Sequence, residues 1–179
     1  RGDLVAVFDA DFVPTRNFLQ RTVGFFQDPQ VGLVQTPQSF YNADPIARNL
    51  GLEDVVTPEE EVFYRQIQPI RDGAGSVVCS GTSFIVCRNA LQQAGGFVTD
   101  SLSEDYFTGI RLSAQGYHLI YLDEKLSAGL AAENIAAHAT QRLRWARGTL
   151  QAFFIESNPF TIPGLTFLQR LAHMEGILC

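Results

Sequence analysis

The sequence predicts an α/β protein in which helices cover a layered β-sheet. Short apolar runs rich in β-branched and aromatic residues are typical of buried strands, as in "LVAVF" at residues 4–8 and "VGLVQTP" at 31–37. Between such runs apolar residues recur with helical spacing, and strands that alternate with helices indicate a sheet covered by helical layers. The 179 residues are about the length of one domain and are enough to bury a core.

The first half of the chain reads as strand, helix, strand and helix. A candidate N-cap at Thr15 begins the first helix after the strand at 4–8, and the turn signal "DP" at Asp28 ends it. The strand at 31–37 leads into an irregular stretch with several turn signals. Pro58 and the three glutamates after it favour a helix to about residue 71, because acidic side chains suit the positive end of the helix dipole.

The second half continues the alternation. A glycine-rich loop precedes a strand at 83–88 ("SFIVCR"), and a short helix ("NALQQAGGF") follows. Ser103 is the expected N-cap of the helix in "SEDYFTGIRLSAQGY". A strand at 118–123 ("HLIYLD") then leads to a long helix expected at 134–156, which carries "QRLRWARG".

Charge and cysteine content disfavour several classes of function. The formal net charge is −6, so the chain lacks the basic surface that nonspecific nucleic-acid binding requires, and we expect no nucleic-acid partner. Cys79, Cys87 and Cys179 show neither CxxC nor Cys/His ligand spacing, which disfavours a disulfide framework or a structural zinc site and favours a reducing, cytoplasmic setting. Because the chain opens almost directly into a strand, we expect a piece of a longer protein.

Two aspartates follow the first strand, in "FDAD". At the end of an extended strand, residues i and i+2 point the same way, so Asp9 and Asp11 could face one cation. Paired carboxylates suit Mg²⁺ or Mn²⁺ that also binds phosphate oxygens. Two alternatives remain open: a solvated turn in which Asp11 caps the next helix, and a haloacid-dehalogenase-type phosphatase. The phosphatase is disfavoured because its chemistry needs a lysine before the second acidic pair, and the sole lysine, Lys125, comes after it.

A second acidic pair, Glu104 and Asp105, follows Ser103. Acidic residues in the first turn are ordinary helix-start chemistry, and this alternative stays open. Beside a metal–diphosphate site, one of these carboxylates could instead act as the general base that removes a proton from an attacking sugar hydroxyl.

The third candidate site is "QRLRW". On a helix, Gln141, Arg144 and Trp145 share one face, whereas Arg142 and Arg147 are expected to point elsewhere. An amide, a guanidinium and an indole on one face could bind a diphosphate and stack on a sugar ring. The alternative is a core tryptophan flanked by surface arginines.

These three motifs, in this order, resemble the signature of the processive family-2 glycosyltransferases, most closely the bacterial cellulose synthase catalytic subunits. That signature is DxD, then a TED-like triplet, then Q(Q/R)xRW, and Ser103 stands here for the usual threonine. "VQTPQSFYNADPIARNL" and "VCSGTSF" are similar to two further elements of the family, although "CSGT" departs from its "CGS". The resemblance covers nearly the whole chain. "FVTD" at 97–100 is interpreted as a coincidental turn.

For the donor side, the resemblance implies the C-terminal part of a GT-A catalytic domain, at residues 1–158. Asp9 and Asp11 would bind the diphosphate of UDP-glucose through Mg²⁺ or Mn²⁺, and Gln141 and Arg144 would hold the same diphosphate. Asp105 would be the catalytic base, with Glu104 beside it. The reaction implied is a single inverting displacement, and this chain alone would be inactive because part of the donor pocket would precede residue 1.

For the acceptor side, the resemblance implies a growing β-1,4-glucan whose terminal glucose lies on Trp145. Cys79, Ser80, Gly81 and Thr82 would line the acceptor near a transmembrane channel that belongs to the same protein. The implied setting is the cytoplasmic side of the inner membrane, with possible accessory synthase subunits. Synthesis of another β-glycan and a non-catalytic scaffold of a secretion complex are the alternatives.

Residues 159–179 are expected to form an amphipathic interfacial helix that leads toward a membrane segment. Its polar side would carry Gln169, Arg170 and His173. The more apolar side would carry Leu165, Phe167, Leu168, Leu171 and Ala172, with Glu175 at the same spacing. A helix packed on the domain is the alternative.

Overall fold

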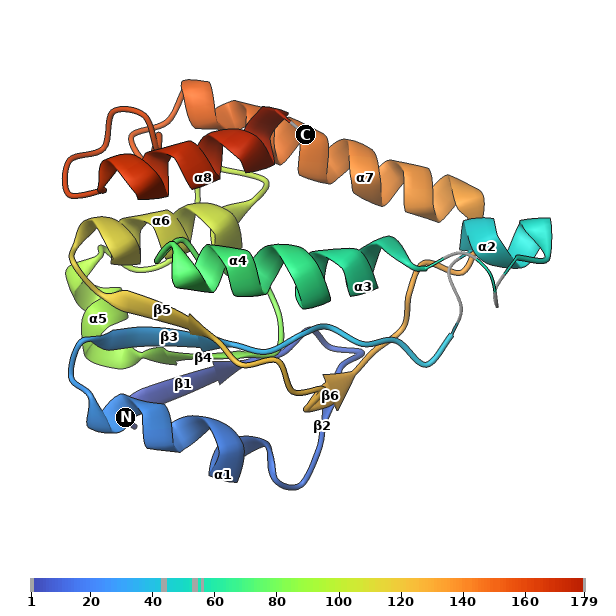
Figure 1. Ribbon diagram of the computed structural model, residues 1–179, viewed down its shortest axis with the longest axis horizontal. Coiled ribbons are helices and arrows are strands. Elements are labelled where there is room, and N and C mark those ends of the chain that lie inside the picture. Colours follow the sequence, from blue (N-terminus) through green and yellow to red (C-terminus); the bar gives the residue numbers. More distant parts are fainter. Residues whose placement is uncertain (1, 43–44, 53–54, 56, 179) are drawn as a thin grey trace.

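Four strands form a mixed β-sheet at the centre of the fold (Figure 1). The computed structural model describes residues 2–42, 45–52, 55 and 57–178. The strands are β1 (Leu4–Val7), β3 (Val31–Gln35), β4 (Phe84–Cys87) and β5 (His118–Tyr121), in the spatial order β1-β4-β3-β5. β4 is antiparallel to β1 and β3, whereas β3 and β5 are parallel. The four strands expected from the apolar runs are therefore confirmed.

Helices cover both faces of this sheet (Figure 1). On one face lies α1 (Phe18–Thr22), and on the other lie α6 (Glu104–Ala114) and the helical segment made of α3 (Glu59–Val62), η2 (Phe63–Ile67) and α4 (Gln68–Gly73). An outer layer over these helices consists of α7 (Ile135–Leu150) and α8 (Phe167–Leu178). The remaining elements are η1 (Val23–Gln27), α2 (Pro45–Leu50), α5 (Arg88–Gln93), η3 (Gln151–Phe153) and a small antiparallel pair, β2 (Val13–Pro14) with β6 (Ser127–Ala128).

The expected helix start at Thr15 is wrong. The amide and the hydroxyl of Thr15 both donate to the carbonyl of Leu126, at 2.8 and 3.1 Å, and this pairing extends the small β2–β6 sheet. The helix begins only after Asn17 and tightens into the 3-10 turn η1 before Asp28. A long-range strand pairing therefore overrides the local capping signal at Thr15.

The other helix boundaries follow the sequence signals with two local differences. The helix expected after Pro58 contains the π-helical turn η2, a feature that is common near functional sites. Ser103 occupies the N-cap position of α6, but its side chain makes no capping hydrogen bond. Asn134 does cap α7, accepting from the amide of Ala137 at 2.9 Å, and α7 ends at Leu150 rather than near residue 156.

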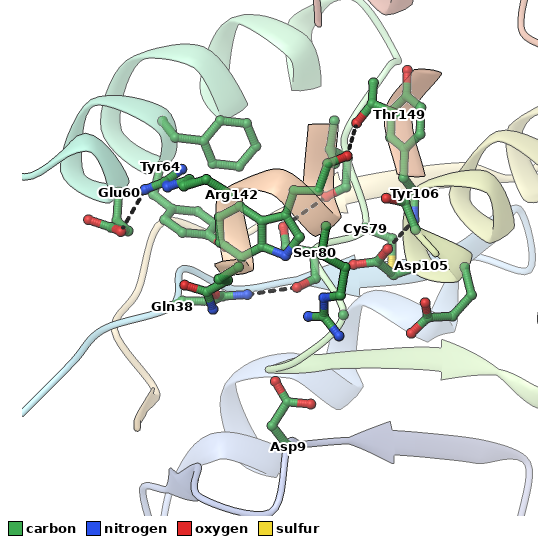
Figure 2. Close-up of a pocket in the computed structure, with 18 of the residues that line it drawn as sticks. Asp9, Gln38, Glu60, Tyr64, Cys79, Ser80, Asp105, Tyr106, Arg142 and Thr149 are labelled. Atoms are coloured by element: carbon green, nitrogen blue, oxygen red, sulfur yellow. Dashed lines mark hydrogen bonds and ion pairs between the residues drawn. The ribbon is translucent and has the colours of Figure 1, made fainter. Parts of the chain in front are cut away.

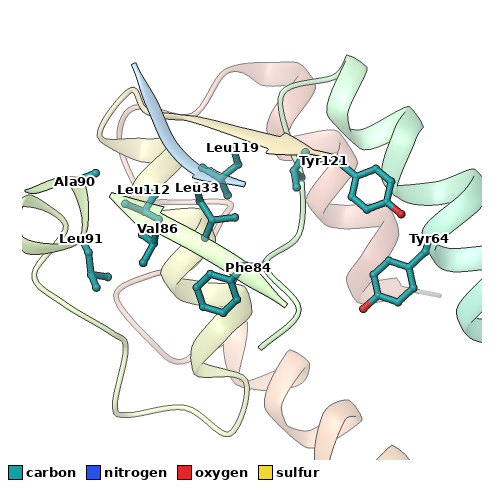
Figure 3. Close-up of a cluster of buried hydrophobic side chains, with 11 residues drawn as sticks. Leu33, Tyr64, Phe84, Val86, Ala90, Leu91, Leu112, Leu119 and Tyr121 are labelled. Carbon is teal, nitrogen blue, oxygen red and sulfur yellow. The ribbon is translucent and has the colours of Figure 1, made fainter. Parts of the chain in front are cut away.

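The main core joins side chains of the sheet to those of the helical elements η2, α5 and α6 (Figure 3). Leu33 and Val86 on neighbouring strands are fully buried against Leu112 of α6. Truncation of such leucines to alanine costs about 2–5 kcal/mol, so this cluster contributes much of the stability. At the end of the sheet that faces α7, Tyr64 and Tyr121 stack with ring centroids 6.3 Å apart.

The C-terminal helix α8 packs on the domain through its polar side. Gln169 donates to the carbonyl of Gly75 at 2.8 Å, Arg170 donates to two loop carbonyls, and His173 is 2% exposed and lies against Tyr106. Thr166 and Gln169 exchange hydrogen bonds in a capping box that fixes the start of the helix.

The apolar side of α8 faces solvent. Phe167 is 76% exposed and Leu168 is 56% exposed, and Leu171 and Met174 continue the same face. An amphipathic helix is present within the expected range 159–179, but it begins only at Phe167. Leu165, expected on its apolar side, precedes the helix and is buried. The polar side of α8 is the one that is buried, so the alternative of a helix packed on the domain is the one observed. None of the helices in the described part of the chain combines the length and hydropathy needed to cross a membrane.

Candidate active site

One pocket of about 590 Å³ brings together the three sites that the sequence singled out (Figure 2). It opens beyond the tips of β1 and β4, and the start of α6 and the middle of α7 form its walls. The predicted residues that line it are Asp9, Asp11, Cys79, Ser80, Gly81, Glu104, Asp105, Gln141, Arg144 and Trp145. Residues separated by more than 130 positions in sequence thus share one cavity.

Asp9 and Asp11 reach the pocket from a turn. The amide of Phe12 donates to the carbonyl of Asp9 at 3.0 Å, which closes a turn across the "DADF" tetrapeptide. The expectation that both aspartates sit on an extended strand end is therefore wrong, although both side chains line the cavity. The Asp11 carboxylate accepts from the amide of Leu130 at 3.3 Å. Partial burial raises the pKa of Asp9, and the neighbouring charge of Asp11 raises it further.

The paired carboxylates of Asp9 and Asp11 are candidate ligands for a cation in this pocket. Among the residues that the structure describes, no group of three or more His, Cys, Asp or Glu side chains is placed to hold a metal ion. Asp9 and Asp11 offer hard oxygen ligands. Burial raises the pKa of Asp9 and the charge of Asp11 raises it further, and a cation beside both carboxylates would favour their ionised forms. Since Mg²⁺ commonly takes one or two carboxylates and fills its shell with phosphate oxygens and water, the donor set fits such an ion.

Three glutamine side chains hold the loop 78–82, which forms the floor of the pocket. Gln35 is fully buried and binds Ser80 through its amide oxygen at 2.9 Å. Gln68 is also fully buried and grips the first residue of the loop through both amide atoms, at 3.0 and 2.8 Å. Gln38 donates to the carbonyl of Ser80 at 2.6 Å (Figure 2). A buried amide that is satisfied at both ends fixes the backbone it binds.

Cys79 and Thr82 lie deeper than the expected acceptor contacts. Cys79 is 1% exposed, belongs to the main core, and has a thiol whose pKa is raised by burial. Thr82 is fully buried and does not line the pocket; its hydroxyl accepts from the amide of Asp9 at 2.9 Å. Thr82 therefore stabilises the turn at Asp9–Asp11 through this hydrogen bond.

Asp105 has the electrostatics of a general base. Burial raises its pKa to about 6; the charge of Glu104 adds to this rise, and a hydrogen bond from the amide of Tyr106, at 2.8 Å, opposes it (Figure 2). Gly81 faces this carboxylate with φ of +80°, and a Cβ atom there would lie 2.8 Å from Asp105 Oδ2. Glycine at position 81 thus permits the positive φ of the loop, and the lack of a side chain there leaves space for the Asp105 carboxylate.

The "QRLRW" face of α7 forms the opposite wall. Gln141, Arg144 and Trp145 line the pocket together, as the helical spacing predicts. The expectation that Arg142 points elsewhere is wrong: its guanidinium lies 4.8 Å from the centroid of the Trp145 ring. The same side chain pairs with Glu60 of α3 at 3.3 Å (Figure 2). A long arginine side chain reaches back along the helix in a way that spacing alone does not capture.

Trp145 and Gln141 separate this pocket from a second, smaller one of about 150 Å³. Further along α7, a Cβ atom at Gly148 would clash with the hydroxyl of Ser103, so α7 closely approaches the residue that precedes the acidic pair. The absence of a side chain at Gly148 therefore lets α7 pack closely against the N-cap residue of α6.

Several pocket residues were not found from the sequence. Gln38, Glu60, Tyr64 and Tyr106 line the cavity, yet each lies in a segment with ordinary helix or loop composition. The structural role of Gln35 could have been predicted from the sequence. A glutamine at the end of the otherwise apolar run "VGLVQ" needs hydrogen-bond partners when it is buried.

Comparison with known proteins identifies relatives over the whole chain. Residues 4–178 match the family described as "Glycosyl transferase family group 2". "Cellulose synthase 1" of Komagataeibacter xylinus is 41% identical over 177 residues, and the match covers 98% of this chain and 11% of that protein. "Cellulose synthase catalytic subunit [UDP-forming]" of Xanthomonas axonopodis pv. citri (strain 306) is 39% identical over 99% of this chain and 24% of that protein. The chain therefore spans a quarter or less of the length of these relatives.

Two solved structures share the fold. The mannosyltransferase PcManGT from Pyrobaculum calidifontis, in complex with GDP-Man and Mn²⁺, superposes with a TM-score of 0.60 at 20% identity, over 99% of this chain and 51% of its own. S. aureus TarS superposes with a TM-score of 0.57 at 12% identity, over 99% of this chain and 28% of its own. At these identities the likeness shows a mixed α/β fold shared with glycosyltransferases of the GT-A type. Because the family match runs from residue 4 to residue 178, the chain belongs to the glycosyltransferases of family group 2.

Proposed function

We propose that residues 1–158 are the C-terminal portion of the GT-A domain of a membrane-associated, processive β-1,4-glucan synthase. This enzyme would transfer glucose from UDP-glucose to the non-reducing end of the growing chain, with inversion. The observation that carries the proposal is a carboxyl with a pKa of about 6, Asp105, in one cavity with an aspartate pair and an amide–guanidinium–indole face. The cellulose synthases named among the relatives support the choice of donor and product.

Asp105 is the general base of this reaction. With a pKa of about 6 it is ionised at neutral pH and is still basic enough to accept the proton of the acceptor hydroxyl. As the hydroxyl oxygen bonds to the anomeric carbon, the bond from that carbon to the UDP oxygen breaks, and UDP leaves. A single displacement of this kind inverts the anomeric centre. Glu104, which also lines the cavity, raises the basicity of Asp105 by its charge.

Asp9, Asp11, Gln141 and Arg144 bind the donor diphosphate. Arg144 donates to phosphate oxygens and offsets the charge that grows on UDP as the bond breaks. The two aspartates would hold Mg²⁺ or Mn²⁺, and the complex of PcManGT with GDP-Man and Mn²⁺ supports a divalent ion in this kind of site. When bound, the ion supplies a positive charge that stabilises the leaving diphosphate.

Trp145 and the loop 78–82 position the acceptor. The indole presents a flat apolar surface on which a sugar ring stacks, and the loop provides polar backbone groups opposite it. Ser80 and Gly81 contact the terminal glucose from that loop. The buried Cys79 and Thr82 support the loop from inside the domain, and the hydroxyl of Thr82 accepts from the amide of Asp9. The three glutamines that hold the loop keep this floor fixed while the chain advances.

Within the segment 159–179, the helix α8 would lie at the cytoplasmic leaflet of the inner membrane as an interfacial helix. The exposed side of α8 carries Phe167, Leu168, Leu171 and Met174, and Phe154, 88% exposed, lies just beyond α7. Apolar side chains that line one face of an amphipathic helix favour insertion between lipid head groups. The growing glucan would pass into a transmembrane channel elsewhere in the same protein, where accessory synthase subunits would assemble.

The test is glucan synthesis by the full-length synthase that contains these residues, with Asp105→Asn as the variant. Loss of the base is expected to lower synthesis by about 10²-fold or more, while UDP binding is kept. Asp100→Asn, an exposed aspartate outside the pocket, is the matched control. Unchanged synthesis by Asp105→Asn would exclude this residue as the base.

The product and donor are tested in the same preparation. UDP-glucose is expected to be used in preference to UDP-N-acetylglucosamine, and the product is expected to be digested by β-1,4-specific glucanases only. A product of another sugar or linkage would assign the same site to a different β-glycan, and absence of any product would favour a non-catalytic scaffold.

A further inference from the structure

The indole of Trp145 stands between two cavities. It lines both the main pocket and the smaller one behind it. A side chain with empty space on two sides lacks the close packing that normally holds an aromatic ring in one orientation. A stacking platform for a sugar nevertheless needs a fixed orientation, because small misplacements of a bound substrate cost much of the rate.

Arg142 supplies a contact that restrains this ring. Its guanidinium lies 4.8 Å from the centroid of the indole, within the distance of a cation–π interaction. An arginine side chain loses considerable rotamer freedom when it is held in one place, so a stack of this kind needs an anchor for the guanidinium.

Glu60 is that anchor. Its carboxylate Oε1 lies 3.3 Å from Nη2 of Arg142, and the two side chains are only 22% and 28% exposed. Partial burial protects the ion pair from screening by salt. Glu60 belongs to α3, so the pair ties α7 to a separate helix at the point where the π turn η2 begins.

We propose that Glu60 is a positioning residue that holds Trp145 in its acceptor-binding orientation by pinning Arg142 against the ring. Arg142 covers one face of the indole and leaves the other for the sugar. The role rests on the proposed function, since it treats Trp145 as the acceptor platform. The restraint of the ring itself can be measured without any substrate.

The neighbouring residue Glu61 provides a matched control. Glu61 is also ion-paired, with Lys125 and with Arg65 at 2.5 Å, but it lines only the smaller pocket. Glu60→Gln and Glu61→Gln therefore remove the same charge from adjacent positions of one helix, and only Glu60→Gln removes the ion pair between Glu60 and Arg142.

The first readout is the fluorescence of Trp145, the sole tryptophan of this chain. Glu60→Gln is expected to raise the acrylamide quenching constant about twofold or more and to broaden the near-ultraviolet dichroism of the ring, whereas Glu61→Gln leaves both unchanged. Glu60→Asp, which keeps the charge, is expected to recover part of the effect. Far-ultraviolet dichroism of each variant checks that the fold is retained.

The second readout is the kinetics of the full-length synthase with a soluble β-1,4-glucan oligosaccharide as added acceptor. Glu60→Gln is expected to raise KM for this acceptor about five- to twentyfold and to change kcat by less than about threefold, with KM for UDP-glucose unchanged. If quenching or acceptor KM stays at the parental value in Glu60→Gln, the positioning role is overturned. Failure of the proposed function would appear differently, as full synthesis by Asp105→Asn while the fluorescence result persists.

Discussion

Replacement of Asp105 by asparagine is expected to stabilise the protein while it abolishes catalysis. Burial raises the pKa of this carboxyl from its ordinary value of 3.8 to about 6, which means that the fold disfavours its ionised form. One pKa unit corresponds to about 1.4 kcal/mol, so at pH 8 the charged side chain costs up to about 3 kcal/mol of folding free energy. Asparagine has nearly the same shape and no charge, and removes that cost.

The sign of the pH dependence follows from the raised pKa. The fold disfavours only the ionised form of the Asp105 carboxyl. The free energy of unfolding that this ionisation costs at pH 8 is therefore regained as the pH falls through about 6 toward 4 and the carboxyl becomes protonated. The gain from Asp105→Asn is therefore expected to be about 3 kcal/mol at pH 8 and close to zero at pH 4. For a chain of this length, the gain at pH 8 corresponds to a rise in Tm of roughly 10 °C.

The assay is urea unfolding of this 179-residue chain at pH 8, 6 and 4, followed by far-ultraviolet dichroism. Asp100→Asn is the control, because Asp100 is exposed and outside the pocket, and it is expected to change stability by less than about 0.5 kcal/mol. Equal stability of Asp105→Asn and the parent at pH 8, or a gain that persists undiminished at pH 4, would refute the reasoning.

Three further predictions concern the residues around the pocket. Gly81→Ala is expected to lower kcat at least tenfold, because the added Cβ atom would displace the Asp105 carboxylate. Gly96→Ala controls for backbone strain, because Gly96 has a similar positive φ but open space around it. Equal kcat values for the two variants would contradict the displacement of Asp105. Gln35→Leu is expected to cost about 2–4 kcal/mol in urea unfolding, because two backbone groups of the loop 78–82 lose their partner; a cost below about 1 kcal/mol would show that the loop does not depend on it. Burial lowers the pKa of His173 to about 4, and the charge of Arg71 lowers it further. Because the fold disfavours the protonated ring, the free energy of unfolding is expected to fall by up to about 3 kcal/mol between pH 6.5 and pH 4. His173→Gln should make the free energy of unfolding less dependent on pH in this range, and an unchanged dependence would show that another group is responsible.

Local periodicity predicted the parts of the site that lie within one element. The face that joins Gln141, Arg144 and Trp145 follows from helical spacing, and the acidic pair at the start of α6 follows from the helix-start signal after Ser103. The α7 face and the acidic pair each depend on a few neighbouring residues, so both can be predicted from a single sequence.

Contacts between distant elements could not be predicted in the same way. Gln35 binds Ser80 across 45 positions, and Glu60 meets Arg142 across 82, and no local pattern encodes such partners. Thr15 pairs with a strand that lies far along the chain, although its local sequence resembles a helix cap.

The C-terminal helix illustrates a different difficulty. Amphipathic periodicity identified the two sides of α8, but it does not say which side packs on the domain. Tyr106, Gly75 and two loop carbonyls offer hydrogen-bond partners on the domain, so the polar side of α8 is the one that is buried. The geometry of its partners therefore decides the orientation of the helix.

The pH dependence of kcat/KM for UDP-glucose turnover by the full-length synthase tests the central claim most directly, because it reports the ionisation of the base in the free enzyme. We predict that kcat/KM falls about tenfold per pH unit below pH 6, the region in which Asp105 takes up its proton. Asp105→Asn is predicted to lose at least about 10²-fold of the activity and to show no such acidic limb. A wild-type profile that stays flat down to pH 4.5, or an Asp105→Asn enzyme that retains the activity and the limb, would contradict the assignment of Asp105 as the base.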